Sequence, residues 1–144
     1  MTVIEDRIRA IEDREEIREL TARYCHAIAA ADVVTIVDLF CEDGSFCTGD
    51  RVTKGTAALT KFYSDLSQMP PIPFIQNHVI DELSESEARA RCSAEIRMVR
   101  NGESITTAGW YEDTFRRDDG KWKFLQRKFN VFHMVPLHKG WADS

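Results

Sequence analysis

The sequence lacks any apolar run long enough to cross a membrane. Its longest uncharged apolar runs, residues 27–31 and 33–37, are far shorter than the roughly 20 residues that a transmembrane helix needs. The N-terminus also lacks a secretory core, since charged residues begin at Glu5. We therefore expect a cytosolic protein that has no membrane partner.

The chain has no excess of basic residues. It carries 19 Lys and Arg against 24 Asp and Glu, a formal net charge of −5, and the two signs are interleaved along the chain. A nucleic-acid partner calls for a basic face. We therefore expect no nucleic-acid partner.

Motifs for disulfides and metals are also missing. No C-x-x-C, H-x-H or H-E-x-x-H spacing occurs, and a cytosolic chain keeps its thiols reduced. We expect no metal site and cysteines that pack as small apolar side chains. The residues concerned are Cys25, Cys41, Cys47, Cys92, His26, His78, His133 and His138.

What is present suits one ordinary globular domain spanning residues 1–144. The length fits a single domain, and the contents of 43% hydrophobic and 30% charged residues are typical of such domains. A chain of this length can bury roughly two thirds of its unfolded surface, so it needs no cross-link to hold a core.

The first half reads as helical. Ile4, Ile8 and Ile11 recur at helical spacing, and Asp13 with Glu16 resembles a capping box that would start a second helix. Its apolar stripe continues to about residue 31. The stripe consists of Ile17, Leu20, Tyr24, Cys25 and Ile28.

Shorter elements follow this stripe. Asp32 can cap a short helix that buries residues 36, 39 and 40 and ends at Asp43-Gly44. A small hairpin around residues 48–50 comes next. Thr56 can cap a third helix reaching about Met69, and the prolines of residues 69–73 then form a rigid loop.

The second half alternates with period 2, which predicts strands at residues 75–83, 88–100, 104–117 and 121–132. Helices followed by strands indicate an α+β fold. Asn101-Gly102 is a strong signal for a two-residue hairpin turn. That turn pairs Cys92 with Tyr111, Ala94 with Gly109 and, on the opposite face, Arg91 with Glu112.

The turn at residues 118–120 leaves two registers open for the last strand. A three-residue loop, which we favour because Gly120 accepts a positive φ, pairs Tyr111 with Arg127 and Gly109 with Phe129. A two-residue turn pairs Tyr111 with Lys128 instead. In the favoured register Ala108, Trp110 and Phe124 lie on the outer face.

Several of these segments together resemble the SnoaL-like polyketide cyclase and dehydratase family of the nuclear transport factor 2-like superfamily. The resemblance covers about residues 11–131. It rests on residues 13–20 leading into Tyr24, on Leu39-Phe40 before Glu42-Asp43-Gly44, and on Gly109-x-Tyr111-x-Asp113 before Asp119-Gly120-x-Trp122-Lys123-Phe124 and Arg127.

The resemblance implies a cone, in which three N-terminal helices close a curved, mainly antiparallel sheet. The superfamily includes scytalone dehydratase, a bile acid dehydratase and lindane dehydrochlorinase, which act on small ring compounds. It implies chemistry without a cofactor and a homodimer formed through the outer sheet face.

The resemblance also implies a histidine base on the first long strand, where His78 is the only histidine. Relatives often carry an asparagine four residues after the base. If Asn77 is that asparagine, the base position falls on Pro73 and His78 points the other way. The helix carboxylate that supports the base in relatives falls on Ala29, so the usual His-Asp pair is incomplete, and Asp113 is a candidate replacement.

The remaining site residues each have a functional and a structural interpretation. Tyr24 and Tyr111 match pocket tyrosines that polarise a carbonyl or donate a proton, but they also suit a core. Arg127 matches an anion stabiliser, or it forms a salt bridge to Asp113 within the sheet. The predicted pocket lining consists of Cys25, Ala29, Cys92, Ala94, Asp113 and Phe129.

Three functional hypotheses follow. The leading one is a lyase or isomerase that uses His78, Tyr24, Tyr111 and Arg127 on a small apolar ring compound. The second is a binding module that keeps a hydrophobic pocket without turnover, which Ala29 favours. The third is a structural dimer whose cone is filled by its own side chains. The first requires its four residues to converge inside the cone.

Overall fold

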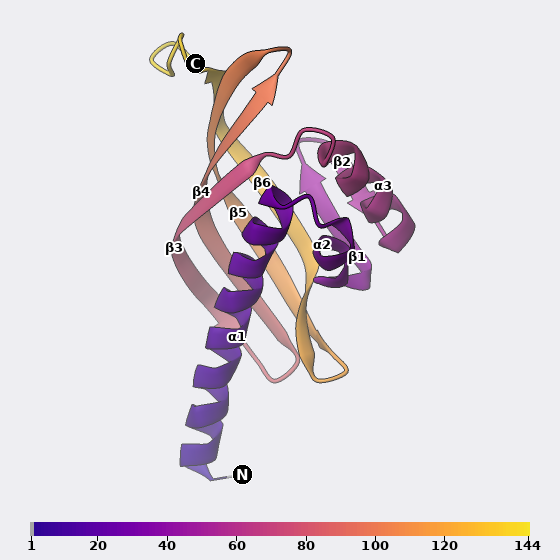
Figure 1. Cartoon of the computed structure of the whole chain (residues 1–144). Coiled ribbons are helices and arrows are strands. Elements are labelled where there is room, and N and C mark those ends of the chain that lie inside the picture. Colours follow the sequence, from indigo (N-terminus) through magenta and orange to yellow (C-terminus); the bar gives the residue numbers. More distant parts are fainter. Residues whose placement is uncertain (1) are drawn as a thin grey trace.

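One long helix lies along a curved six-stranded sheet. The computed structural model describes residues 2–144, and Figure 1 shows helix α1 (Val3–Ala29) packed along the sheet. The strand order is β2-β1-β6-β5-β4-β3, and only β1 and β6 pair in parallel. The other elements are α2 (Val33–Asp38), β1 (Phe40–Thr48), β2 (Arg51–Lys54), α3 (Thr56–Leu66), β3 (Ile72–Leu83), β4 (Glu87–Arg100), β5 (Glu103–Asp118) and β6 (Lys121–Pro136). The predicted α+β fold is confirmed.

None of the helices among these residues is both long and apolar enough to span a membrane.

Helix α1 is continuous, so the prediction that a second helix starts at Asp13 is wrong. The true N-cap is Thr2, whose side chain accepts a hydrogen bond from the Glu5 amide while the Glu5 carboxylate accepts one from the Thr2 amide. Asp13 and Glu16 face the sheet instead of the helix backbone. Their spacing of three residues places both carboxylates on one side of the helix, which explains the false capping signal.

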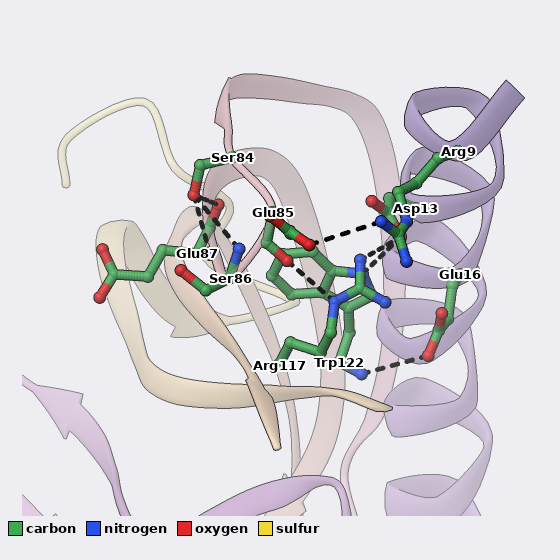
Figure 2. Close-up of polar contacts among 9 residues, drawn as sticks. All are labelled: Arg9, Asp13, Glu16, Ser84, Glu85, Ser86, Glu87, Arg117 and Trp122. Atoms are coloured by element: carbon green, nitrogen blue, oxygen red, sulfur yellow. Dashed lines mark hydrogen bonds and ion pairs between the residues drawn. The ribbon is translucent and has the colours of Figure 1, made fainter. Parts of the chain in front are cut away.

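The two carboxylates attach α1 to the last two strands (Figure 2). Asp13 Oδ1 accepts from Trp122 Nε1 at 3.0 Å and pairs with Arg117 Nη2 at 2.5 Å. Glu16 Oε1 accepts from the Trp122 amide at 3.1 Å. The Arg117 guanidinium also stacks on the Trp122 ring, 4.7 Å from its centroid. These contacts fix the angle at which α1 crosses the sheet.

The short elements differ from expectation mainly at their ends. Asp32 caps α2 through the Thr35 amide as predicted. The helix ends at Asp38, however, and Asp43-Gly44 lies inside β1. Helix α3 has Gly55, at φ 91°, as its N-cap and ends at Leu66. Strand β3 begins at Ile72, so the proline loop is shorter than expected.

The predicted β4–β5 register is confirmed, with Cys92 opposite Tyr111, Ala94 opposite Gly109 and Arg91 opposite Glu112. For β5–β6 the alternative with a two-residue turn is confirmed near the turn, where Asp118 pairs with Lys121, but both partners proposed for Tyr111 are wrong. The turn has two residues, Asp119 and Gly120, both at positive φ, which suits a tight hairpin.

A β-bulge then leaves Leu125 unpaired, because Phe115 pairs with Phe124 and Thr114 with Gln126. The bulge moves Tyr111 opposite Phe129 and Asp113 opposite Arg127. Relative to the favoured register this is a shift of two residues, so Arg127 and Phe129 keep the predicted inner face.

The bulge reverses the prediction for Phe124. Between the turn and the bulge, the side chains of β6 point to the faces opposite to those given by the favoured register. Phe124 therefore faces inward and is fully buried. It packs at 5.0 Å from Phe115 and 5.7 Å from Tyr24, measured between ring centroids. An aromatic core therefore lies between α1 and the inner face of the sheet.

Replacing Asp13 with Ala should destabilise the fold by about 2–4 kcal/mol, because a guanidinium and an indole N–H each lose a largely buried partner. Urea unfolding measures the loss. The matched control is Glu15→Ala, since Glu15 is exposed on the same helix and should change the free energy of unfolding by no more than about 0.5 kcal/mol. Equal effects of the two substitutions would contradict the role given to Asp13.

Candidate active site

A bulge in β3 turns His78 toward the inside of the fold. Gln76 pairs with Ser93 and Val79 with Arg91, so Asn77 and His78 together face the single residue Cys92. Asn77 takes the left-handed conformation at φ 56°, which one class of bulge uses and which asparagine adopts more readily than most residues. The expectation from the sequence is that His78 points outward if Pro73 points inward. This expectation is wrong, because the bulge between the two residues shifts the alternation of side chains along β3.

Thr21 on α1 holds the imidazole. The distance from His78 Nε2 to Thr21 Oγ1 is 3.3 Å, and Thr21 Oγ1 donates to the Ile17 carbonyl at 3.0 Å. Because the hydroxyl has one proton and gives it to Ile17, it accepts from His78, which assigns the proton of the ring to Nε2. His78 Nδ1 then carries a lone pair. This atom is buried and has no hydrogen-bond partner within the described residues.

Arg127 and Asp113 form a completely buried ion pair across β6 and β5. Arg127 Nε lies 3.4 Å from Asp113 Oδ1, and neither side chain is exposed. The guanidinium carbon lies 3.5 Å from the centroid of Tyr111 and 4.3 Å from that of Tyr24. The salt bridge that the sequence offered as a structural interpretation of Arg127 is therefore present.

The ion pair leaves hydrogen-bonding capacity unused. No nitrogen of the Arg127 guanidinium and no oxygen of the Asp113 carboxylate has a hydrogen-bond partner among residues 2–144. Buried polar atoms without partners are costly and rare. These atoms and the free Nδ1 of His78 are all buried, and the charge of Arg127 acts on the pKa of His78, so this interior is the candidate site.

Tyrosine hydroxyls complete the polar interior. Tyr24 Oη lies 2.9 Å from Tyr63 Oη, which projects from α3. Burial raises the pKa of Tyr24, Tyr63 and Tyr111. All three phenols therefore stay protonated near neutral pH and can donate hydrogen bonds. We call the set formed by Thr21, Tyr24, Tyr63, His78, Tyr111, Asp113 and Arg127 the interior cluster.

The charge state of the cluster follows from burial and from Arg127. Burial, then the charges of Arg127 and Arg18, lower the pKa of His78 to about 4, so the ring is neutral at pH 7. Burial raises the pKa of Asp113 to about 6, against the lowering effect of Arg127. Burial opposes the charge of Arg127, but Asp113 and the surrounding phenols raise its pKa overall, and it stays charged.

The predicted lining residues divide into two groups. Cys92, Ala94, Asp113 and Phe129 are buried on the inner face, whereas Cys25 is half-buried and Ala29 is exposed at the end of α1. Burial raises the pKa of Cys25, and that of Cys92 to about 12, so both thiols stay protonated. No group of three or more His, Cys, Asp or Glu side chains in the described chain is placed to bind a metal.

The predicted catalytic residues come together. Tyr24, Tyr111 and Arg127 are in contact, and Thr21 links His78 to the same face of α1 as Tyr24. Gly109 allows this packing, since a Cβ there would come within 2.9 Å of Phe129 Cζ and would also overlap the Asn130 carbonyl oxygen. Phe129 therefore packs against Tyr111 with 4.9 Å between ring centroids.

A separate groove of about 700 Å³ lies outside the interior cluster. It is bordered by the start of β3, the β4–β5 hairpin and the C-terminal tail, and Met98, His133 and Trp141 are among its lining residues. None of its lining residues belongs to the cluster. We place the candidate site at the cluster because the unpartnered buried groups and the shifted pKa values are found there.

Two cluster residues were not predicted as functional. Thr21 lies on the buried stripe of α1 between Ile17 and Tyr24, and Tyr63 lies on the buried side of α3. The helical spacing indicates that both face inward. Their polar contacts depend on how the helices cross the sheet, which the local sequence does not contain.

Comparison with known proteins identifies the family. Residues 9–128 match the SnoaL-like domain family, and the chain belongs to it. No curated protein matches the sequence at a significant level.

Solved structures agree on the fold. A nuclear transport factor 2-like protein with a cystatin-like fold from Novosphingobium aromaticivorans is 28% identical, with 90% of this chain and 88% of that one covered at a TM-score of 0.74. A protein assigned as a scytalone dehydratase from the same species is 22% identical, covered at 90% of both chains with a TM-score of 0.81. Hexachlorocyclohexane dehydrochlorinase type 3 from Novosphingobium barchaimii is 17% identical, covered at 89% and 92% with a TM-score of 0.80.

The lowered pKa of His78 has a measurable effect on stability. Between pH 6.5, the ordinary value, and about 4 the unfolded chain binds a proton that the folded chain does not. Stability should therefore decrease as the pH falls from 6.5 to about 4, by about 1–2 kcal/mol from His78, since solvent screens the partly buried ring. Asp113 acts in the opposite direction, because its raised pKa lets the folded chain bind a proton first as the pH falls below about 6.

The variant His78→Asn separates the two effects. It should lose less stability than the wild type between pH 6.5 and 4, measured by urea unfolding at each pH. His26→Asn, at an exposed position on α1, is the control and should follow the wild-type curve. Parallel curves for His78→Asn and the wild type would contradict a buried neutral His78.

Proposed function

We propose that this chain is a cofactor-independent lyase or isomerase of the dehydratase type, acting on a small and largely apolar ring compound. The observation that supports it most is the free and buried Nδ1 of His78, together with the unpartnered Arg127 guanidinium, whose charge acts on the pKa of His78. A neutral imidazole with a free lone pair can take a proton from carbon. A charged donor close by can stabilise the negative charge that develops.

In this mechanism His78 Nδ1 removes a proton from a carbon next to a carbonyl group. The electron pair of the broken C–H bond moves toward the carbonyl, and Arg127 with the Tyr111 and Tyr24 hydroxyls stabilises the resulting oxyanion. When the oxyanion collapses, a C=C bond forms and the bond to the leaving hydroxyl breaks. A proton from the His78 imidazolium or from the Tyr24–Tyr63 pair then converts the leaving hydroxyl to water.

The names of the similar structures support an elimination. One describes a dehydratase and another a dehydrochlorinase, and both names denote the loss of a small molecule from neighbouring carbons. Their identity with this chain is low, so the proposal for this protein depends on its own cluster residues.

The Thr21 hydroxyl, which orients His78 from α1, limits the class of substrates that His78 can deprotonate. Thr21 is neutral and fixes the tautomer of His78, but it cannot stabilise the imidazolium as a carboxylate would. Together with the lowered pKa of about 4, this makes His78 a weak base. A weak base needs an acidic C–H bond, so we expect a ring ketone or a related carbonyl compound as the substrate.

The alternative is a module that binds such a compound without turning it over. The low pKa of His78 favours it, as does the exposed position of Ala29, since no carboxylate is hydrogen-bonded to the imidazole. In this case Arg127 and the tyrosine hydroxyls would bind the polar group of the ligand and the reaction would be missing.

A homodimer formed through the outer sheet face remains part of the proposal. Support comes from exposed apolar side chains that face outward on the edge strand β3 and on its neighbour β4. These are Ile72, Phe74, Val79 and Val99. The cytosolic location inferred from the sequence likewise stays a prediction.

Activity can be tested with scytalone, a ring ketone, as the probe, by following loss of water. The variant His78→Asn should lower kcat/KM by about 10²–10⁴, the usual contribution of a general base. The wild-type kcat/KM should be level above about pH 5 and fall below about pH 4, as the pKa of His78 requires. His26→Asn again serves as the control.

The outcomes discriminate between the two functions. Turnover that His78→Asn leaves unchanged would contradict the histidine chemistry. A probe that binds equally to the wild type and to His78→Asn, with product formed by neither, would favour the binding module.

Thr21 can be tested separately as a positioning residue. Thr21→Val keeps the shape but removes the acceptor for His78 Nε2–H, and should lower kcat by about 10–100-fold with little change in KM. Thr21→Ser should restore the rate. Nitrogen-15 NMR should show Nε2 protonated in the wild type and a mixture of tautomers in Thr21→Val. Wild-type activity and spectrum in Thr21→Val would contradict this role.

A further inference from the structure

The first turns of α1 carry three exposed isoleucines that the fold does not use. Ile4, Ile8 and Ile11 are 68%, 51% and 65% exposed. In Figure 1 this part of α1 extends past the ends of the neighbouring strands. Isoleucine has a lower helix propensity than the polar residues usual on a helix surface, so three of them at regular spacing call for an explanation.

The isoleucines face away from their own domain. Asp13 and Ile17 are buried and mark the side of α1 that contacts the sheet. With about 100° per residue, Ile4, Ile8 and Ile11 fall on the opposite side of the helix. No rearrangement of the sheet beneath α1 could cover them, so whatever covers them comes from outside this chain.

Their spacing and their flanks fit a helical partner of the same sequence. Steps of four and three residues form the seam of a coiled coil. Along this seam, Glu5 and Glu12 occupy one flank and Arg7 and Arg14 the other. In a parallel pair, each flank of one helix lies beside the opposite flank of its partner, so Arg7 comes beside Glu12 of the partner subunit. An antiparallel pair would set Arg beside Arg and Glu beside Glu.

The charges argue against a membrane surface as the partner. The residues around the seam include three acids, Glu5, Asp6 and Glu12, besides the arginines. An interfacial membrane helix instead carries mainly basic residues on its polar face. The helix is already formed by the Thr2 cap and by its packing on the sheet, so association would not have to fold it.

We propose that residues 4–14 of α1 pack in parallel against the same residues of further copies of this chain. Isoleucine at both kinds of seam position favours more than two strands, and the number of copies is read from the mass of the assembly. This contact is separate from the outer sheet face and does not depend on the proposed enzymatic function.

Sedimentation and light scattering of the whole protein, up to near-millimolar concentration, test the contact. The triple variant Ile4→Ser, Ile8→Ser, Ile11→Ser should have a lower mass than the wild type at equal concentration, while its circular dichroism and melting temperature show that the domain still folds. Val34→Ser, at an exposed apolar position on α2 outside both contacts, is the matched control and should keep the wild-type mass. A wild type that stays monomeric, or a triple variant with the same mass as Val34→Ser, would overturn the proposal.

A charge exchange tests the parallel orientation. Arg7→Glu alone and Glu12→Arg alone each place like charges side by side and should weaken association about tenfold over the several equivalent pairs. The double variant Arg7→Glu with Glu12→Arg should restore it. If Arg7→Glu alone strengthens association, or if the double variant stays as weak as the single ones, the parallel contact is wrong.

Discussion

The buried ion pair of Arg127 and Asp113 is the interaction on which the rest of the interior depends. Transferring a guanidinium from water into a core costs several kcal/mol. Here the charge is offset by one carboxylate and by the faces of Tyr24 and Tyr111. The same charge lowers the pKa of His78 and helps to keep the imidazole neutral. Burial is the larger cause of the pKa shifts here, and the charge of Arg127 adds to it at His78 and opposes it at Asp113, so the salt bridge and the charge state of the candidate site are linked.

The sequence predicts the regular parts of the fold and misses the local irregularities of the sheet, two of which affect the candidate site. Asn101-Gly102 fixes the β4–β5 register, and Asp32 marks the start of α2, because both depend on residues close in sequence. The bulges at Asn77 and Leu125 each shift one strand by a single residue. Nothing in the composition around Leu125 signals a bulge, since the extra residue is accommodated by the curvature of the whole sheet. The capping signal at Asp13 fails for a related reason, because its hydrogen-bond partner is Trp122, far along the chain.

The inner location of the candidate site could be predicted better than its contacts. Alternation along β5 and β6 places Tyr111, Asp113, Arg127 and Phe129 on one face, and the two-residue shift in register leaves that face unchanged. The partner of His78 could not be predicted in this way. Counting along the helix points to Ala29, which is exposed, whereas the imidazole contacts Thr21 two turns earlier. Which turn of α1 faces His78 depends on the crossing angle that Trp122 helps to fix.

The position of β6 affects the order in which the protein can fold. This last strand lies in the middle of the sheet, between β1 and β5, and supplies Arg127 to the interior. Without β6, the β1–β2 hairpin and the β3–β5 sheet have no strand to join them. A chain emerging from the ribosome therefore exposes its aromatic core residues until β6 is released, and non-local pairings such as that of β6 with β1 form slowly in general. The domain cannot close its core before β6 is available, and a chain that stops before β6 leaves its aromatic core residues exposed.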